Sequence, residues 1–163
     1  MKNLKLSVII AMIAMAMTSC VKEQTAFDFE DVPYYATIIG NARYNDGYRI
    51  EPGRTSTIEA KGLCIHVTVN NSDYSTNSGQ SVFFTNTDEK GNFKISIPCT
   101  LNGVTATITT DDFINPYYDS PGSYTYKIYT LSKAQTISNL TPHSIKQCVL
   151  TDFNSKTADP TIR

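Results

Sequence analysis

Cys64 and His66 are the two residues whose types and spacing most directly suggest chemistry. They alternate with apolar residues in a predicted strand, so both side chains point to the same face of it. A thiol and an imidazole placed in this way could begin a metal site, or could act as a nucleophile and its base. A structural zinc takes four ligands, however, and the other histidine, His143, has no close-spaced partner. The sequence therefore favours an ordinary sheet face, and we predict no metal, no cofactor and no catalytic residue.

Beyond Cys20, the chain has an odd number of cysteines, namely Cys64, Cys99 and Cys148. If the protein is exported, a disulfide can form. Strand alternation places Cys99 on the core side of its strand, and Cys148 lies inside an apolar run. A Cys99–Cys148 bridge is the first expectation, and three buried free thiols are the alternative.

Two groups of acidic residues could bind calcium or act as acid and base. Asp88 and Glu89 lie beside a glycine, and Asp111 is followed by Asp112 at a predicted strand end. The alternating Asp and Asn spacing of a calcium loop is absent, so turn formation and strand termination account for these residues. The chain also lacks a nucleophile elbow, a zinc-protease motif and a phosphate-binding glycine loop. We predict that the protein is not an enzyme.

Tyrosines mark two predicted turn regions. Residues 115–122, NPYYDSPG, form a segment bounded by Pro and Gly, and residues 45–47 form an Asn-Asp-Gly turn between two further tyrosines. Tyrosines exposed on loops can stack on sugars or form hot spots for protein binding. Alternatively, they could cover the open ends of the fold. The candidate binding residues are Tyr44, Tyr48, Tyr117 and Tyr118.

From Tyr34 onward the chain consists of short runs with period-two alternation, separated by turn residues. In the clearest run, residues 92–98, Phe93, Ile95 and Ile97 alternate with polar residues. Turns are expected at 45–47 and 88–91, and no helix is expected beyond the first twenty residues. Further strands are predicted at 34–41, 55–60, 62–70, 81–87, 104–108, 124–128 and 146–150.

Composition supports an all-β fold. The chain has 163 residues, of which 40% are apolar, and this is enough for one domain with a core. Its ten Tyr and seven Phe, together with abundant Thr, favour strands. Several short strands at this spacing predict an antiparallel two-sheet sandwich over residues 34–163. A formal net charge of −1 gives no basic surface for nucleic acid.

The amino terminus has the features of an export signal. Residues 1–5 are basic, and the apolar run of residues 7–17 is shorter than the roughly 20 residues that span a bilayer. We therefore expect residues 1–19 to be a cleaved signal peptide. Thr18-Ser19-Cys20 resembles a bacterial lipobox, and a serine before the cysteine is similar to lipoproteins of the Bacteroidetes group. The resemblance implies cleavage before Cys20 and acyl chains on it; an ordinary secretory signal is the alternative.

Residues 20–33 are expected to be a tether, because Glu23, Asp28, Glu30 and Asp31 outweigh a single lysine. Acidic residues soon after the lipidated cysteine resemble the surface-export signal of Bacteroidetes lipoproteins. The resemblance implies attachment to the outer membrane, on the cell surface rather than the periplasmic face.

A second resemblance covers residues 34–110. The strand at 36–40 ending in Gly, the turn at 45–47, the apolar strand at 62–69 and the motif Thr87-Asp-Glu-Lys-Gly-Asn-Phe93 are together similar to carboxypeptidase regulatory-like domains. Those domains are transthyretin-like (prealbumin-type) Greek-key sandwiches. The resemblance implies a structural or binding module, and it brings no peptidase residues with it.

These observations predict a non-enzymatic, lipid-anchored β-sandwich of the cell envelope that binds or scaffolds another molecule. Its expected partners are the membrane, through the lipid, and envelope proteins or glycans. One alternative is a surface glycan-binding lipoprotein that uses the loop tyrosines, although the absence of Trp weighs against it. The other is a fimbria-like subunit.

Overall fold

A computed structural model describes residues 34–51, 54–74 and 78–159. The predicted signal peptide, Cys20 and the acidic tether lie outside these residues. No helix within the described ranges is long and apolar enough to cross a membrane.

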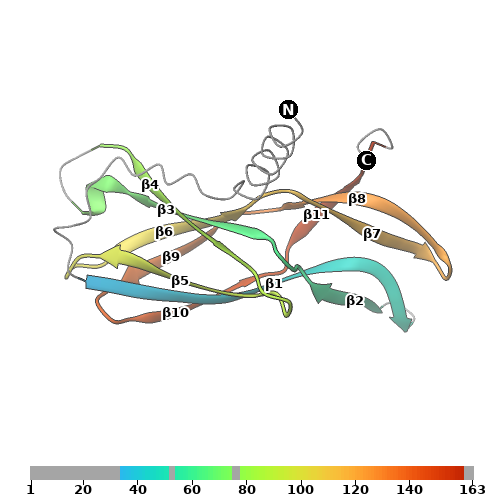
Figure 1. Cartoon of the computed structure of the whole chain (residues 1–163), viewed down its shortest axis with the longest axis horizontal. Coiled ribbons are helices and arrows are strands. Elements are labelled where there is room, and N and C mark those ends of the chain that lie inside the picture. Colours follow the sequence, from blue (N-terminus) through green and yellow to red (C-terminus); the bar gives the residue numbers. More distant parts are fainter. Residues whose placement is uncertain (1–33, 52–53, 75–77, 160–163) are drawn as a thin grey trace, which may run out of the picture.

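Eleven strands and one short 3₁₀ helix make up the described chain (Figure 1). The helix η1 spans Asn71–Asp73. The strands are β1 Tyr34–Glu51, β2 Arg54–Glu59, β3 Cys64–Asn70, β4 Gln80–Asn86, β5 Asn92–Cys99, β6 Val104–Thr110, β7 Phe113–Ser120, β8 Ser123–Leu131, β9 Gln135–Leu140, β10 Ile145–Leu150 and β11 Phe153–Thr157.

Two sheets form the main sandwich. In the first, β1 lies between β5 and β10; in the second, the strand order is β4-β3-β6-β9. Figure 1 shows β5, β1 and β10 along the lower side and β3, β4 and β6 along the upper side. Ile38 and Ile95 of the first sheet belong to the same buried cluster as Val67 and Ile108 of the second. The predicted all-β sandwich is therefore confirmed.

Period-two alternation identified the core strands correctly. Along β5, Phe93, Ile95 and Ile97 are buried and Lys94 is exposed. Along β3, the buried side includes Ile65, Val67 and Val69, as predicted.

The predicted turn at Asp88 is also confirmed. The backbone N–H groups of Lys90 and Asn92 both donate to Asp88 Oδ1 at 2.8 Å. The hydrogen bond from the backbone of Asn92 is the main reason that the pKa of Asp88 lies below its usual value. Asp88 therefore holds the turn that links β4 of the second sheet to β5 of the first, and turn chemistry accounts for it.

The Asn45-Asp46-Gly47 turn does not reverse the chain, contrary to the prediction. It produces a register irregularity inside β1, and the reversal falls later, between the paired residues Glu51 and Arg54. Local turn chemistry is nonetheless present, because the backbone N–H of Gly47 donates to Asn45 Oδ1 at 2.7 Å and Gly47 has φ of 78°. These residues bend the long strand rather than end it, as bulges do.

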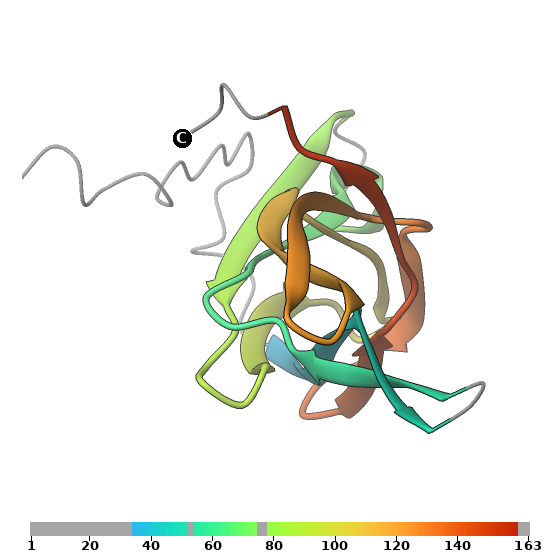
Figure 2. The same cartoon turned by 90° about the vertical axis from the view of Figure 1, so that its right-hand side faces the viewer.

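Beyond Ala42, where its pairing with β10 ends, β1 leaves the main sandwich. Its second half pairs with β2 and packs on a third sheet of order β11-β8-β7. Figure 2 shows the β7–β8 hairpin at this end of the molecule, next to the β1–β2 hairpin. Between them lies an aromatic cluster in which the ring of Tyr129 is 4.6 Å from that of Tyr44 and 5.2 Å from that of Phe113. One strand therefore serves two packed layers.

Two further expectations need correction. The sandwich is not wholly antiparallel, because β1 and β10 pair in parallel. Three strands, β7, β9 and β11, were not predicted, and the first of them occupies most of the segment predicted as the loop 115–122.

The predicted Cys99–Cys148 disulfide is absent: Cys64, Cys99 and Cys148 are all buried, and none of them forms a disulfide. Cys99 pairs with Tyr34 on one side of β1, whereas Cys148 pairs with Gly40 on the other side. Those two positions of β1 are roughly 20 Å apart at the usual rise per residue, and a disulfide needs Cα atoms within about 7 Å. Cys99 and Cys148 therefore pack among apolar residues, and burial raises the pKa of Cys148 to about 11.

Candidate functional site

The four candidate tyrosines do not form one surface. Tyr44 is only 3% exposed and belongs to the aromatic cluster, so its prediction as a surface binding residue was wrong. Tyr48 and Tyr118 are 52% and 37% exposed, and their rings meet edge to face at 5.9 Å. Only this pair of the four remains as a candidate for binding.

Tyr117 lies inside the third sheet. Because residues 113–120 form a strand rather than a loop, Tyr117 and Tyr118 point to opposite faces. The Tyr117 ring covers Gly47 so closely that a Cβ there would be 2.5 Å from Tyr117 Cζ. On the same face, Lys127 Nζ lies 3.2 Å from the ring centroid, a cation–π contact. Tyr117 therefore has a structural role.

The exposed tyrosines continue along β8. The Tyr118 ring lies 6.1 Å from that of Tyr124, which lies 5.7 Å from that of Tyr126. Tyr124 and Tyr126, both in β8, are exposed. We call the surface formed by Tyr48, Tyr118, Tyr124 and Tyr126 the tyrosine face. Sequence analysis had placed residues 124–128 in a strand but had not connected them with Tyr118. The missing information was the β7–β8 pairing, in which Tyr118 is directly opposite Tyr124.

The outer face of the β7–β8 ribbon carries no charged residue along its paired length. Cross-strand partners on this face are Tyr118 with Tyr124, Pro116 with Tyr126, and Ile114 with Ile128. The inner face is apolar at one end, where Phe113 and Tyr129 pack into the aromatic cluster, and carries Asn115 and Lys127 further along. An antiparallel sheet with one face in water normally has polar residues on that face. An exposed face made of aromatic and aliphatic residues without charge is instead typical of a surface that binds another molecule.

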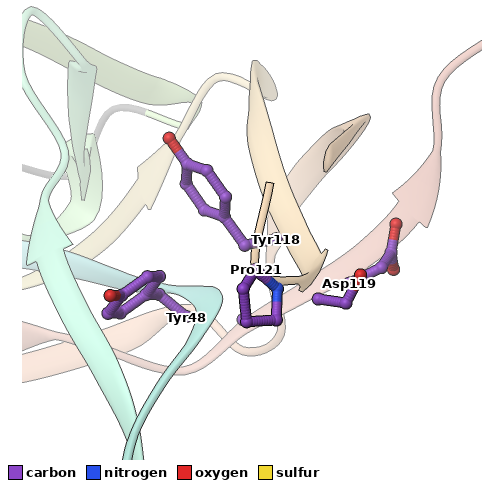
Figure 3. Close-up of a pocket in the computed structure, with 6 residues that line it drawn as sticks. Tyr48, Tyr118, Asp119 and Pro121 are labelled. Atoms are coloured by element: carbon purple, nitrogen blue, oxygen red, sulfur yellow. The ribbon is translucent and has the colours of Figure 1, made fainter. Parts of the chain in front are cut away.

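A pocket of about 220 Å³ lies at the turn end of the tyrosine face (Figure 3). In Figure 3, Tyr48 comes from β1, whereas Tyr118, Asp119 and Pro121 come from the tip of the β7–β8 hairpin, with Asp119 turned away from Tyr118. The carboxylate of Asp119 accepts a hydrogen bond from Thr125 Oγ1 at 3.1 Å. Since small-molecule sites usually measure about 300–1,000 Å³, this pocket suits a single side chain or sugar ring.

A wider hollow of about 390 Å³ lies over the main sandwich; of the predicted site residues it is lined by Cys148 and by none of the candidate tyrosines. Its lining comes from β1, β5 and β10 and includes Ile39, Asn92, Gln147 and Val149. No chemically reactive cluster accompanies it among these residues.

Cys64 and His66 come together with a third residue that sequence analysis had not linked to them. Asp111 follows β6 directly, and its Oδ1 lies 3.0 Å from His66 Nε2. The phenyl ring of Phe84 and the imidazole of His66 also pack edge to face, with ring centroids 4.9 Å apart. Period-two spacing predicted that Cys64 and His66 share a face, but the position of Asp111 depends on which strand pairs with β3.

Comparisons with known proteins leave the family open. No family model matches the chain, and no curated protein matches it. Solved structures that it resembles include a 9R-lipoxygenase from Cyanothece PCC8801, with a TM-score of 0.45 and 13% identity over 88% of this chain. The match covers 20% of the lipoxygenase, so the chain spans about one fifth of that protein's length.

A second similar structure is the major plantain pollen allergen Pla l 1, with a TM-score of 0.37 and 17% identity. The match covers 77% of this chain and 98% of the allergen. At these scores neither likeness supports an argument about function, and the resemblance to carboxypeptidase regulatory-like domains stays a prediction.

Proposed function

We propose that this chain is a lipid-anchored, non-enzymatic protein of the cell envelope that binds a protein partner through the tyrosine face. The observation that carries the proposal is the continuous row of contacting, exposed rings on a ribbon without outward charges. The other requirement, the anchor, rests on the lipobox resemblance of residues 18–20.

The chemistry of the tyrosine face fits a protein interface. Interface cores are depleted in charged residues and enriched in Tyr, which combines a large apolar ring with a polar tip. The rings also hold each other: Tyr48 meets Tyr118 at an interplanar angle of 87°, and Tyr124 meets Tyr126 at 86°. Side chains fixed in this way lose little conformational freedom on binding, which lowers the cost of association.

A glycan is the second candidate, and the pocket beside Tyr48 and Tyr118 favours it. The pocket combines two aromatic rings with Asp119 and Ser120, which can hydrogen-bond to sugar hydroxyls. The edge-to-face packing argues against it as the main ligand, because in such a pair one ring covers part of the stacking surface of the other. We therefore give the protein partner first place.

The binding proposal is tested with the double variant Tyr118→Ser, Tyr124→Ser in cells that produce the chain from its own signal. A photoreactive residue placed at position 126 should crosslink to a defined envelope protein in the parent chain and not in the double variant. Tyr35→Ser is the matched control, since Tyr35 is 50% exposed but lies at the opposite end of β1. Equal crosslinking in all three chains would exclude the tyrosine face.

The glycan alternative is tested with the same three chains by electrophoresis through affinity gels that contain envelope polysaccharides. Retardation that is lost in the double variant, without any protein crosslink, would favour the second candidate. Both variants should keep the parent melting temperature, because the substituted side chains are on the outer surface.

The anchor is tested separately by labelling with radioactive or alkyne palmitate. The parent chain should take up label and fractionate with the outer membrane, whereas Cys20→Ala should do neither. A parent chain without label would contradict the proposed lipid anchor. It would not bear on the proposal that the tyrosine face binds a partner.

A further inference from the structure

Three different metal-ligating side chains converge at one end of the second sheet. The thiol sulfur of Cys64, an imidazole nitrogen of His66 and a carboxylate oxygen of Asp111 all lie within 4.8 Å of one another. We propose that these three residues bind a divalent transition-metal ion, preferentially Zn²⁺, and leave one coordination position open. This site is separate from the tyrosine face and does not depend on the proposed binding function.

The sheet itself holds the three ligands in place. Cys64 and His66 lie on one face of β3, and β3 pairs with β6 so that Ile65 is opposite Thr110. Asp111, the next residue, is therefore level with Cys64, and its backbone N–H donates to the Cys64 carbonyl at 3.3 Å. Ligands that are carried by paired strands are positioned more precisely than ligands on loops.

The spacing is close to what a tetrahedral ion needs. Zinc bonds of 2.0–2.3 Å to N, O and S imply donor atoms about 3.3–3.8 Å apart. His66 Nε2 and Asp111 Oδ1 are 3.0 Å apart, and no donor pair exceeds 4.8 Å. The largest donor separation therefore exceeds the tetrahedral spacing by at most about 1 Å.

Burial shows where the open position would lie. Cys64 is buried, whereas the side chains of His66 and Asp111 are 28% and 58% exposed. An ion bound here would have its sulfur ligand on the protein side and its free position toward solvent. Three protein ligands with one open position are typical of sites where zinc carries water or a ligand, and closed structural sites use four.

The donor set selects the class of metal. A thiolate and an imidazole favour Zn²⁺ and its transition-metal neighbours, whereas Ca²⁺ and Mg²⁺ require oxygen ligands. On binding, the Cys64 thiol gives its proton to solvent and forms the metal–sulfur bond, and Asp111 exchanges its contact with His66 for the metal. The His66 nitrogen that binds the ion carries no proton, so the imidazole binds as its neutral form with its one proton on the other ring nitrogen, and any second proton goes to solvent. The Phe84 ring against His66 limits rotation of the imidazole and helps to keep it in place.

Cobalt(II) is the probe for this site, because a cobalt–thiolate bond gives a charge-transfer band and four-coordinate cobalt gives strong visible bands. The whole chain is titrated with Co²⁺ under reducing conditions. Every sample carries Cys20→Ala, so that the cysteine of the predicted anchor cannot bind the metal. We expect saturation at one ion per chain, with both kinds of band, and displacement of the cobalt by Zn²⁺.

Asp111→Asn is the decisive variant, because this exposed side chain can change without disturbing the core. It should weaken Co²⁺ binding by at least about tenfold, since loss of even an outer-shell partner costs 10–100-fold. Cys64→Ser should abolish the charge-transfer band, and His66→Gln should remove the four-coordinate spectrum. Cys148→Ser, which changes a buried thiol elsewhere, should leave both unchanged.

A second measurement uses alkylation of the thiols followed by mass spectrometry. Zn²⁺ should slow iodoacetamide labelling of Cys64 in the parent chain and in Cys148→Ser, but not in Asp111→Asn. The proposal is overturned if the parent chain shows no thiolate band. It is equally overturned if Asp111→Asn and His66→Gln bind Co²⁺ as the parent does, because the metal would then sit on a thiol alone.

Discussion

The ring of Phe93 lies directly over the backbone of Gly40, its cross-strand partner in the β1–β5 ladder. A Cβ on residue 40 would be 2.2 Å from Phe93 Cζ and 2.6 Å from the carbonyl oxygen of Cys148. An aromatic ring that covers a glycine in this way protects the backbone and packs against the neighbouring strand. Gly40 is therefore required by close packing on both sides and not by its backbone conformation.

Gly40→Ala should destabilise the sandwich, because the added methyl group meets the Phe93 ring and a carbonyl that cannot move without shifting β10. Overpacking of this kind costs about 1–3 kcal/mol. Urea unfolding of the variant gives the measurement. Gly62→Ala is the matched control for added volume, since a Cβ at Gly62 meets nothing within 4 Å, although its φ of +63° makes some cost expected there too. An unchanged midpoint for Gly40→Ala would contradict the close contact.

Phe93→Ala and Lys94→Ala test the assignment of faces on β5. Phe93 is buried, so truncation should lower the free energy of unfolding by about 3–5 kcal/mol. Lys94 is exposed, and its replacement should stay within about 0.5 kcal/mol. Both values come from chemical denaturation, and equal midpoints for the two variants would refute the assigned faces.

Tyr129→Phe should leave stability unchanged or raise it by up to about 1 kcal/mol. The Tyr129 hydroxyl is buried without a hydrogen-bond partner in the described part of the chain, while the ring stacks on Phe113. Removing an unsatisfied buried hydroxyl costs nothing in bonding, and the ring packing remains. Tyr74→Phe is the control, because the Tyr74 hydroxyl donates to the Pro98 carbonyl at 3.0 Å and its loss should cost about 1 kcal/mol. The opposite ranking of the two melting temperatures would contradict the prediction.

Stability should fall at alkaline pH as buried thiols and phenols lose their protons, Cys148 and Tyr44 among them. Burial raises the pKa of Cys148 from 9.0 to about 11, and burial with the nearby Asp46 raises the pKa of Tyr44 from 10.0 to about 12. Both groups are neutral when protonated, so the unfolded chain loses these protons first as pH rises. The stabilisation is complete below pH 9 and is lost toward pH 11 for Cys148 and pH 12 for Tyr44. Unfolding free energies measured across this range should fall less steeply between pH 9 and 11 in Cys148→Ala.

Adjacent tyrosines should respond differently to truncation. Tyr117→Ala removes the ring that covers Gly47 and holds Lys127, and it should lower the melting temperature clearly. Tyr118→Ala alters the outer face and should change it little. If the two variants melt together, the opposite orientation of these neighbours in β7 would be in doubt.

Periodicity predicted the strands that have one apolar and one polar face. It succeeded for β3, β5 and β6 because each of them lies between water and one core. It missed β7, where Pro116 and Asp119 are turn-forming residues in other contexts. Pro116 is tolerated because β7 pairs only with β8 and has a free edge. A strand at an edge with apolar residues on both faces has no alternation for sequence reasoning to detect.

Long-range pairing was the second limit. Asn45, Asp46 and Gly47 form their local hydrogen bonds as expected, yet whether such residues reverse a chain or bend it depends on the strands around them. The same is true of Asp111, whose place beside His66 is set by the register between β3 and β6. Spacing along the chain can identify ligands on one strand, but it cannot reveal a ligand that comes from the next strand.

The long strand β1 has a mechanical consequence. Its first residue, Tyr34, follows the predicted tether, and Tyr48 near its other end belongs to the tyrosine face, up to about 45 Å away along an extended strand. A force between the membrane and a bound partner would act along the length of β1. This strand is hydrogen-bonded to β5 on one side and to β10 on the other. Those ladders would be loaded in shear, so their hydrogen bonds would share the force and would not open one after another.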